Sequence, residues 1–573
     1  MTRAFNRHGG ATGTGRTALL NAGFAAGALN ALIWGLATPA TADTLVYNVD
    51  AITLDENGEI KRFTQFVFDE QGIITHVLER GEDRPEGIDF AMDGEGQVVL
   101  PGMIDANVEL MDLGFAELTL DLSQASNFDA ALGRIAAFAE ANQGRPWIIG
   151  RGWDEARWQM GRFPTAADLD ALIPDRPIWL ERADGSAGWG NSLALELAGI
   201  DAEIADPAGG RIVRDDTGKP SGVFIGTAAA LVAQNVPPPR PEDRDTAFAL
   251  AQQKLLANGV TAIADMGTQL VDWMTYRRAA DLGNLRLRIM AYADAPEVME
   301  LIGGSGPTPW LYDDRLRLNG VMLDFDGSLG ARSAALKAPY ADAPENRGIA
   351  QMTAAQLRNR MSRAALDNFQ TAVHAVGDRA NEEVLLAIEE LALTYTGDRR
   401  WRIEQAEIVT AQDLARFGDH GVIASMQPVQ IGSHALTAPM RVGEERLQGA
   451  YAWRSILEAG GTLALGSGAP GGAVNPFAGI AAAISRTGMD GEPFGGWRAQ
   501  ESVTREQALA GFTSAAAYAG FADGRFGRLV VGERADFLFV DRDPLLAAPA
   551  EIRETRVQEV WIAGQRVFAR DGR

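Results

Sequence analysis

Short apolar runs alternating with turn residues mark both ends of the chain. The runs at residues 65–68 and 73–78 follow glycine-containing turn signals, a pattern typical of short β-strands. A matching set lies near the C-terminus, in "GRLVVGERADFLFVDRDP" and "VQEVWIAGQRVFAR". Two β-rich segments around a long centre predict one small composite β-sandwich, built from residues 43–100 and 521–573.

The centre of the chain, residues 101–520, alternates between strand-like and helical patterns. Apolar runs such as "VTAIADMG", "GVMLDFDG" and "TLALGSGAP" predict strands, and a segment between two such runs places Val384, Ile388 and Leu391 on one helical face. This alternation predicts an α/β fold with a TIM-like (β/α)8 barrel. Active sites of such barrels lie where the strands end, so polar residues at those ends are the candidates.

The first 42 residues differ from the rest of the chain. Three arginines precede the apolar stretch "ALLNAGFAAGALNALIWGLA", which ends in "TPATA" with small residues at Ala40 and Ala42. A positive start, an apolar middle and an A-x-A end are typical of a secretory signal peptide, and a permanent membrane anchor is the alternative. We therefore expect a periplasmic or secreted protein. No later segment reaches the ~20 apolar residues that cross a bilayer.

The net charge limits the kinds of partner that the chain can bind, and the absence of cysteine limits its chemistry. The formal net charge is −24, and loss of residues 1–42, with three arginines and no acids, would lower it to −27. Such a charge argues against nucleic acid or an anionic membrane surface, because both attract basic patches. A small-molecule ligand or substrate is the expected partner. The chain has no cysteine, which excludes disulfides, thiol nucleophiles and thiolate zinc sites.

Several ordered segments resemble the amidohydrolase superfamily. They include "VLPGMIDA", "GWDEARWQMGRFP", "DGSLGARSAALKAPYAD", "HAVGDRANEEVL", "RIEQAE", "GAYAWR" and "VGERADFLFVDRDP". The chain is identified as a member of amidohydrolase family 3, the branch that includes N-substituted formamide deformylase-like proteins. The resemblance implies a metallo-hydrolase barrel with an inserted lobe around residues 145–245, and hydrolysis of carbon–nitrogen bonds other than peptide bonds.

The resemblance also locates six metal-ligand positions, and five of them carry a different residue here. The one retained ligand is His374, and the changed positions are Asn107, Glu109, Met322, Gln405 and Gly468. Glu109 and His374 can still coordinate a metal, but two protein ligands fall short of the three usual in catalytic zinc sites. We therefore expect no standard binuclear zinc centre, although a single divalent ion remains an option.

Three interpretations stay open. In the first, metal chemistry is lost and the pocket of a pseudoenzyme binds a ligand. In the second, Glu109, Asp324 and His374, joined by Asp326, form a rebuilt site for Mn²⁺ or Mg²⁺, ions that prefer oxygen ligands. The alternative for Asp326 is to cap the Gly-Ser loop that follows it. In the third, Glu109 acts with His374 or His434 in metal-free acid–base catalysis.

A further set of polar and aromatic residues is expected around the pocket by resemblance. Trp153 would form a wall of the pocket, and its alternative is ordinary packing within the lobe. His434 is expected on a long loop. The full set of predicted substrate-binding residues is Trp153, Asp184, Ser186, Gln405, Gln427 and His434.

Overall fold

The computed structural model describes residues 43–570, except 156, 184, 186, 208 and 209. The predicted signal peptide at residues 1–42 and the predicted site residues Asp184 and Ser186 lie outside the described residues. Within the described part of the chain, no helix is both long enough and apolar enough to cross a membrane.

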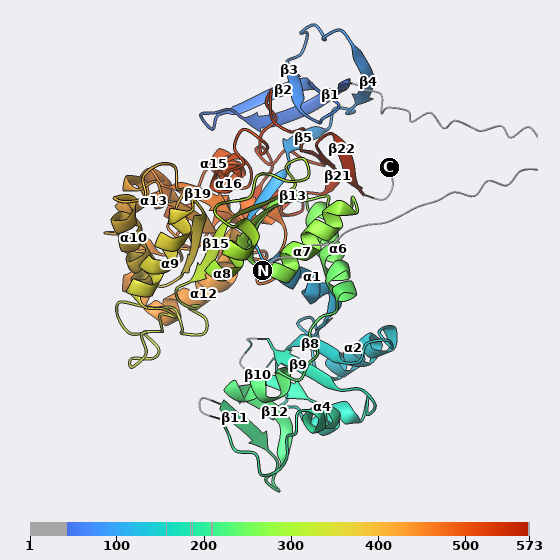
Figure 1. The fold of residues 1–573 in the computed structure, drawn as a ribbon, viewed down its shortest axis with the longest axis vertical. Helices are drawn as coiled ribbons and strands as arrows, with labels where there is room; N and C mark the ends of the chain where they lie inside the picture. Colours follow the sequence, from blue (N-terminus) through green and yellow to red (C-terminus); the bar gives the residue numbers. More distant parts are fainter. Residues whose placement is uncertain (1–42, 156, 184, 186, 208–209, 571–573) are drawn as a thin grey trace, which may run out of the picture. The chain divides into compact units, whose positions relative to one another are not determined.

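Eight parallel strands form a nearly closed barrel, which confirms the predicted fold class (Figure 1). The first strand, β6, meets the last, β19, where Gly468 N donates to the Asn107 carbonyl over 2.9 Å. In spatial order the strands are β6 (Met103–Val108), β13 (Val260–Thr268), β14 (Arg288–Ala293), β15 (Leu316–Asp324), β16 (Gln370–Ala375), β17 (Arg402–Gln405), β18 (Ile423–Met426) and β19 (Thr462–Leu465).

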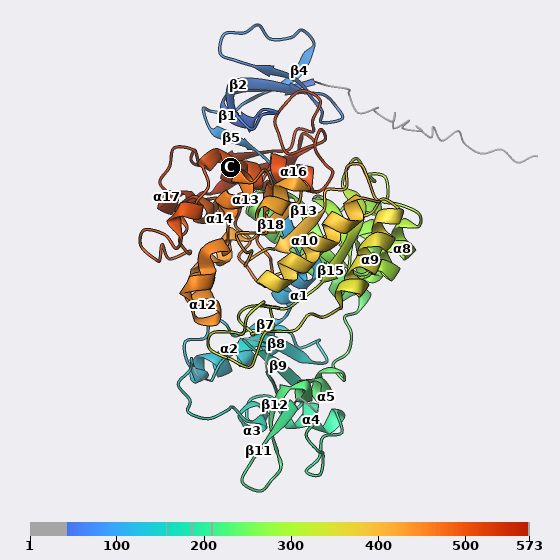
Figure 2. The ribbon, with the colours of Figure 1, turned by 90° about the vertical axis from the view of Figure 1, so that its left-hand side faces the viewer.

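Helices follow the barrel strands, as the alternating pattern predicts, and Figure 2 shows α9 and α10 side by side on the outside of the barrel. In α10 the predicted face is confirmed, since Val384, Ile388 and Leu391 are buried. The main helices are α1 (Leu110–Leu118), α6 (Pro241–Ala257), α7 (Leu270–Asp281), α8 (Pro296–Gly303), α9 (Ala354–Leu366), α10 (Asp378–Ala392), α12 (Ile431–Val442), α14 (Pro476–Ser485), α15 (Arg505–Gly511) and α16 (Ser514–Ala519).

Strands from both chain ends build a second, mixed sheet. Its two halves join where β5 runs antiparallel to β20, and the Phe66 and Phe537 rings pack 5.1 Å apart across its core. The strands are β1 (Asp43–Leu54), β2 (Ile60–Phe68), β3 (Ile74–Leu78), β4 (Ile88–Asp93), β5 (Val98–Pro101), β20 (Phe537–Val540), β21 (Val557–Ile562) and β22 (Gln565–Ala569).

A six-stranded sheet forms the inserted lobe and begins earlier than about residue 145. Helix α2 (Phe128–Ala141) packs Ile135 and Ala139 into the lobe's core, with Trp153, so this helix does not belong to the barrel. The strands are β7 (Leu120–Asp121), β8 (Ile148–Trp153), β9 (Ile178–Arg182), β10 (Ala187–Gly190), β11 (Gly210–Arg214) and β12 (Pro220–Gly226).

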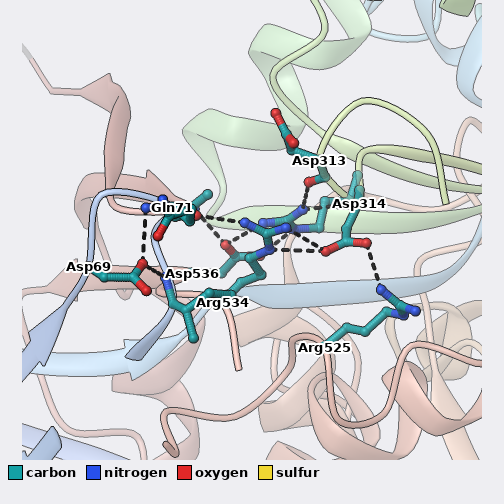
Figure 3. Close-up of polar contacts among 10 residues, drawn as sticks. Asp69, Gln71, Asp313, Asp314, Arg525, Arg534 and Asp536 are labelled. Carbon is teal, nitrogen blue, oxygen red and sulfur yellow. Dashed lines mark hydrogen bonds and ion pairs between the residues drawn. The ribbon is translucent and has the colours of Figure 1, made fainter. Parts of the chain in front are cut away.

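A buried ion pair ties the barrel to the segment that leads into β20. Arg288, the first residue of β14, donates to the Asp536 carboxylate over 2.6 and 2.9 Å, and neither side chain is more than 1% exposed. Beside this pair, Asp314 lies between Arg525 and Arg534, at 2.7 and 2.8 Å (Figure 3). A buried charge needs its partner, so this contact holds the two sheets in one register.

Asp536→Asn should lower the free energy of unfolding by about 3–5 kcal/mol, because it leaves the buried Arg288 charge unpaired. Urea or thermal unfolding measures the change. Glu458→Gln is the matched control, since it breaks an exposed pair with Arg454 and should cost no more than about 0.5 kcal/mol. Equal losses in the two variants would contradict the role given to Asp536.

Candidate functional site

The barrel brings most of the predicted site positions to one edge. Parallel strands end at the same side of a barrel, and each of these residues lies at or just after the end of a strand. Strand β15 also aligns Asp324 with His374 of β16. The positions that share this mouth are Asn107, Glu109, Met322, Asp324, His374, Gln405, Gln427 and Gly468.

Asn107 is engaged by a buried carboxylate. Its side-chain Nδ2 donates to Glu404 Oε2 over 2.6 Å, and Asn107 is only 7% exposed. Its backbone N–H donates to Asp105, which also accepts from Ser467 N on the neighbouring loop. Burial raises the pKa of the Asp105 carboxyl to about 6. The first predicted ligand position therefore holds an amide that is part of a hydrogen-bond network.

Arg402 and Glu404 are the centre of that network, and the sequence analysis did not select them. Arg402 Nε donates to Glu404 Oε1 over 2.7 Å, and Arg402 Nη1 donates to the Tyr292 hydroxyl over 3.0 Å. All three side chains are essentially inaccessible. The available signal was the alternation in "RIEQ", because residues two apart on a strand face the same way. Both point into the barrel.

The last ligand position is a glycine whose backbone conformation disfavours any side chain. Gly468 has a φ of +65°, and a Cβ atom there would lie 2.7 Å from Gln430 Nε2 and 3.1 Å from Gln427 Cγ. A side chain at this position would be strained by its backbone, and Gln430 and Gln427 would have to shift to make space for it. Gln427 itself donates to the Ser425 carbonyl over 3.3 Å.

Glu109 stands at an acidic part of the mouth. Its side chain keeps an exposed surface, yet the surrounding protein removes much of its water. This desolvation, together with the Asp112, Asp265 and Asp324 charges, raises the pKa of Glu109 to about 7. Glu109, Asp112 and Asp265 line a cavity of about 250 Å³ with Arg244. Glu109 can therefore hold or release a proton near neutral pH.

Asp326 and His374 lie close together without a hydrogen bond. His374 Nδ1 is 3.8 Å from Asp326 Oδ1 and has no hydrogen-bond partner within the described structure. Asp326 accepts from the backbone N–H groups of Ala335, Val376 and Gly377 over 2.8 to 2.9 Å. These contacts support the structural alternative for Asp326, which anchors two loops of the mouth.

His434, Trp153 and Gln405 have the following local surroundings. His434 lies in α12, so the expectation of a long loop was wrong; its Nε2 is 3.8 Å from Glu407 Oε1 and its ring lies 5.1 Å from that of Tyr451. Trp153 is completely buried and donates to the Leu180 carbonyl over 2.9 Å, the packing alternative. Gln405 ends β17 with a φ of 72°.

The positions that the resemblance assigns to a metal centre carry His374, Glu109 and side chains that are not usual zinc ligands. Among the described residues, no group of three or more histidine, aspartate or glutamate side chains is arranged to hold a metal ion. The Asn107 amide nitrogen is already bonded to Glu404, Met322 offers only a soft thioether, and Gly468 has no donor.

Comparisons with known proteins agree with this architecture. The chain is 32% identical over 463 residues to the Arabidopsis thaliana protein LONG AFTER FAR-RED 3, covering 78% of each chain. It is 27% identical over 542 residues to the N-substituted formamide deformylase of Arthrobacter pascens, covering 92% of this chain and 99% of that protein.

A solved structure and a family model extend the comparison. A metal-dependent hydrolase from Pyrococcus furiosus superposes with a TM-score of 0.73 at 27% identity, covering 88% of this chain and 100% of that one. The model described as the amidohydrolase family matches residues 91–568. Since this match spans most of the sequence, and the relative that is 32% identical is aligned over 78% of this chain, the chain belongs to the amidohydrolase family.

Proposed function

We propose that this amidohydrolase-family protein binds a small molecule at the barrel mouth without a binuclear metal centre, and that metal-dependent hydrolysis is lost. The observation that carries the proposal is the 2.6 Å hydrogen bond from Asn107 to Glu404. This bond holds the side chain at one predicted metal-ligand position against a buried carboxylate inside the barrel. Gln427 and Gln430 lie beside Gly468, at another predicted metal-ligand position, and also support the absence of a metal centre there.

The chemistry of the mouth favours a neutral or cationic ligand. Glu109, Asp112 and Asp324 are acidic, and Arg244, the cation that lines the same cavity, is paired with Asp272. An amide or amine group would find hydrogen-bond acceptors there, whereas an anion would be repelled. Gln405 and Gln427 are the uncharged polar side chains expected to orient the ligand, and His434 is expected to take part as well.

Metal-free hydrolysis is the second candidate, and the pKa of Glu109 favours it. A carboxyl group with a pKa of about 7 can accept and return a proton near neutral pH, which general acid–base catalysis requires. Glu109 would activate a water molecule, and His374 would protonate the leaving nitrogen. A rebuilt single-ion site at Glu109, Asp324 and His374, joined by Asp326, is the second interpretation of the sequence. It is the weakest, because these residues form no three-ligand group in the described structure.

Export is part of the proposal. The arginines, apolar stretch and A-x-A end of residues 1–42 support a periplasmic or secreted protein. The strong negative charge supports a small-molecule ligand over nucleic acid or a membrane surface.

Purified protein incubated with Mn²⁺ or Zn²⁺ and then desalted should retain far less than one ion per chain, measured by elemental mass spectrometry. Glu109→Gln and His374→Ala should show the same low content, and a panel of amides and formamides should show no metal-stimulated turnover. Near-stoichiometric metal that is lost in either variant would overturn the proposal and support a rebuilt site.

Glu109→Gln should stabilise the protein more at high pH than at low pH. The pKa of Glu109 rises from its ordinary 4.5 to about 7 on folding, so the folded state binds more protons between these values and the residue destabilises the protein increasingly as pH rises through them. The melting-temperature gain of the variant should therefore be larger at about pH 8 than at about pH 5. Equal gains at both pH values would contradict the raised pKa.

Gly468→Asp should lower the free energy of unfolding by about 1–3 kcal/mol and should not recruit metal, because the new side chain meets Gln430 in a left-handed backbone conformation. Gly330→Asp is the matched control: a Cβ atom there has no heavy atom within 4 Å, and its φ is not in the left-handed region. A stable Gly468→Asp protein that binds Zn²⁺ tightly would show that the space is not closed.

A further inference from the structure

A second pocket lies at the opposite end of the barrel from the candidate site. It has a volume of about 380 Å³, and its lining includes residues near the start of β15. Asn319 precedes Asp324 by five residues on that strand, which places the pocket about 17 Å from the mouth. The lining residues used below are Arg317, Asn319, Thr396, Arg399 and Phe521. One acidic residue, Asp398, also lines the pocket, and it is paired with Arg400.

Two arginines of this pocket have no carboxylate partner within ion-pair distance among the described residues. Arg317 donates to the carbonyls of Thr308 and Phe521 over 3.2 and 3.3 Å. Arg399 donates to the Ala365 carbonyl over 3.0 Å and to Asn368 over 2.9 Å, and its buried Nε has no acceptor in the described structure. All of these acceptors are neutral.

The neighbouring Arg400, in contrast, has carboxylate partners for its charge. It pairs with Asp398 at 2.9 Å and also with Asp523. Burial and the nearby Arg525 and Arg400 charges lower the pKa of Arg317, so this cation is held in a place that disfavours its charge. In a chain with a net charge of −24, two partly buried arginines without a counter-ion mark a place where a bound anion would be stabilised.

Asn319 supplies an independent observation in the same lining. It is 2% exposed, and its Nδ2 donates to the Gly520 carbonyl over 2.6 Å, which fixes the orientation of the amide. Its Oδ1 is buried and accepts no hydrogen bond within the described structure. An unsatisfied buried oxygen costs about 1–3 kcal/mol, so a ligand that brings an O–H donor would remove this cost.

We propose that this pocket binds a small hydroxycarboxylate. The carboxylate meets Arg317 and Arg399, and the hydroxyl donates to Asn319 Oδ1. The aromatic ring of Phe521 and the hydroxyl of Thr396 complete the lining. An anion without a hydroxyl would contact only the arginines, and a neutral alcohol would contact only Asn319. A ligand that carries both groups should therefore bind more tightly than either.

Malate and succinate form a matched pair of probes, because they share two carboxylates and differ by one hydroxyl. Calorimetric titration of the full chain should give malate an affinity at least about tenfold higher than succinate. Arg399→Gln should weaken malate binding by about tenfold or more. Arg454→Gln, which removes one exposed positive charge elsewhere, should leave malate binding unchanged.

A melting curve checks that Arg399→Gln is folded, and Arg317→Gln repeats the test from the other arginine. Equal affinity for malate and succinate would overturn the proposal, since Asn319 would then recognise no ligand hydroxyl. Absence of malate binding in the millimolar range would overturn it as well. So would unchanged malate binding in both folded arginine variants.

Discussion

The buried ion pair between Arg402 and Glu404 constrains the whole interior of the barrel. Both side chains are inaccessible, and a charge in that position is tolerable only while its partner and hydrogen bonds remain. Tyr292 accepts from the arginine and Asn107 donates to the glutamate. The pair therefore restricts the side chain of Asn107. If Asn107 turned away, a buried carboxylate oxygen of Glu404 would lose its hydrogen bond.

The residues at the positions that the resemblance assigns to metal ligands form a consistent set under this constraint. An amide at 107 bonds to Glu404, where a neutral imidazole would meet the same carboxylate with one donor and an open ring nitrogen. A glycine at 468 leaves space that Gln427 and Gln430 occupy. Burial of Glu109, together with the charges of Asp112, Asp265 and Asp324, raises the pKa of its carboxyl to about 7.

Much of the fold could be predicted from the sequence because helices and strands have different hydrophobic periods. The face of α10 and the sheet shared by both chain ends follow from such patterns. The start of the inserted lobe could not, since β7 has two residues and α2 is amphipathic whichever core it packs against. The helix that contains His434 was missed because Pro439 lies inside it.

The sequence could predict which residues lie near the site, but it could not predict which of them contact one another. The family resemblance located Glu109 and His374, and strand ends in a barrel converge by geometry, so these two residues could be grouped with Asp324. The bond from Asn107 to Glu404 joins residues 297 apart in sequence, and no local pattern encodes such a pairing. Register between distant strands decided which polar groups satisfy one another.

The pairing of β5 with β20 has a consequence for biosynthesis. Leu100 lies opposite Leu538, so a ribosome makes the first strands of the mixed sheet long before it makes their neighbour. Until then β5 presents an unpaired edge, the kind of surface that other chains can add to. The nascent chain therefore exposes this strand edge until its two ends pair. A chaperone that delays folding would be needed most at that stage.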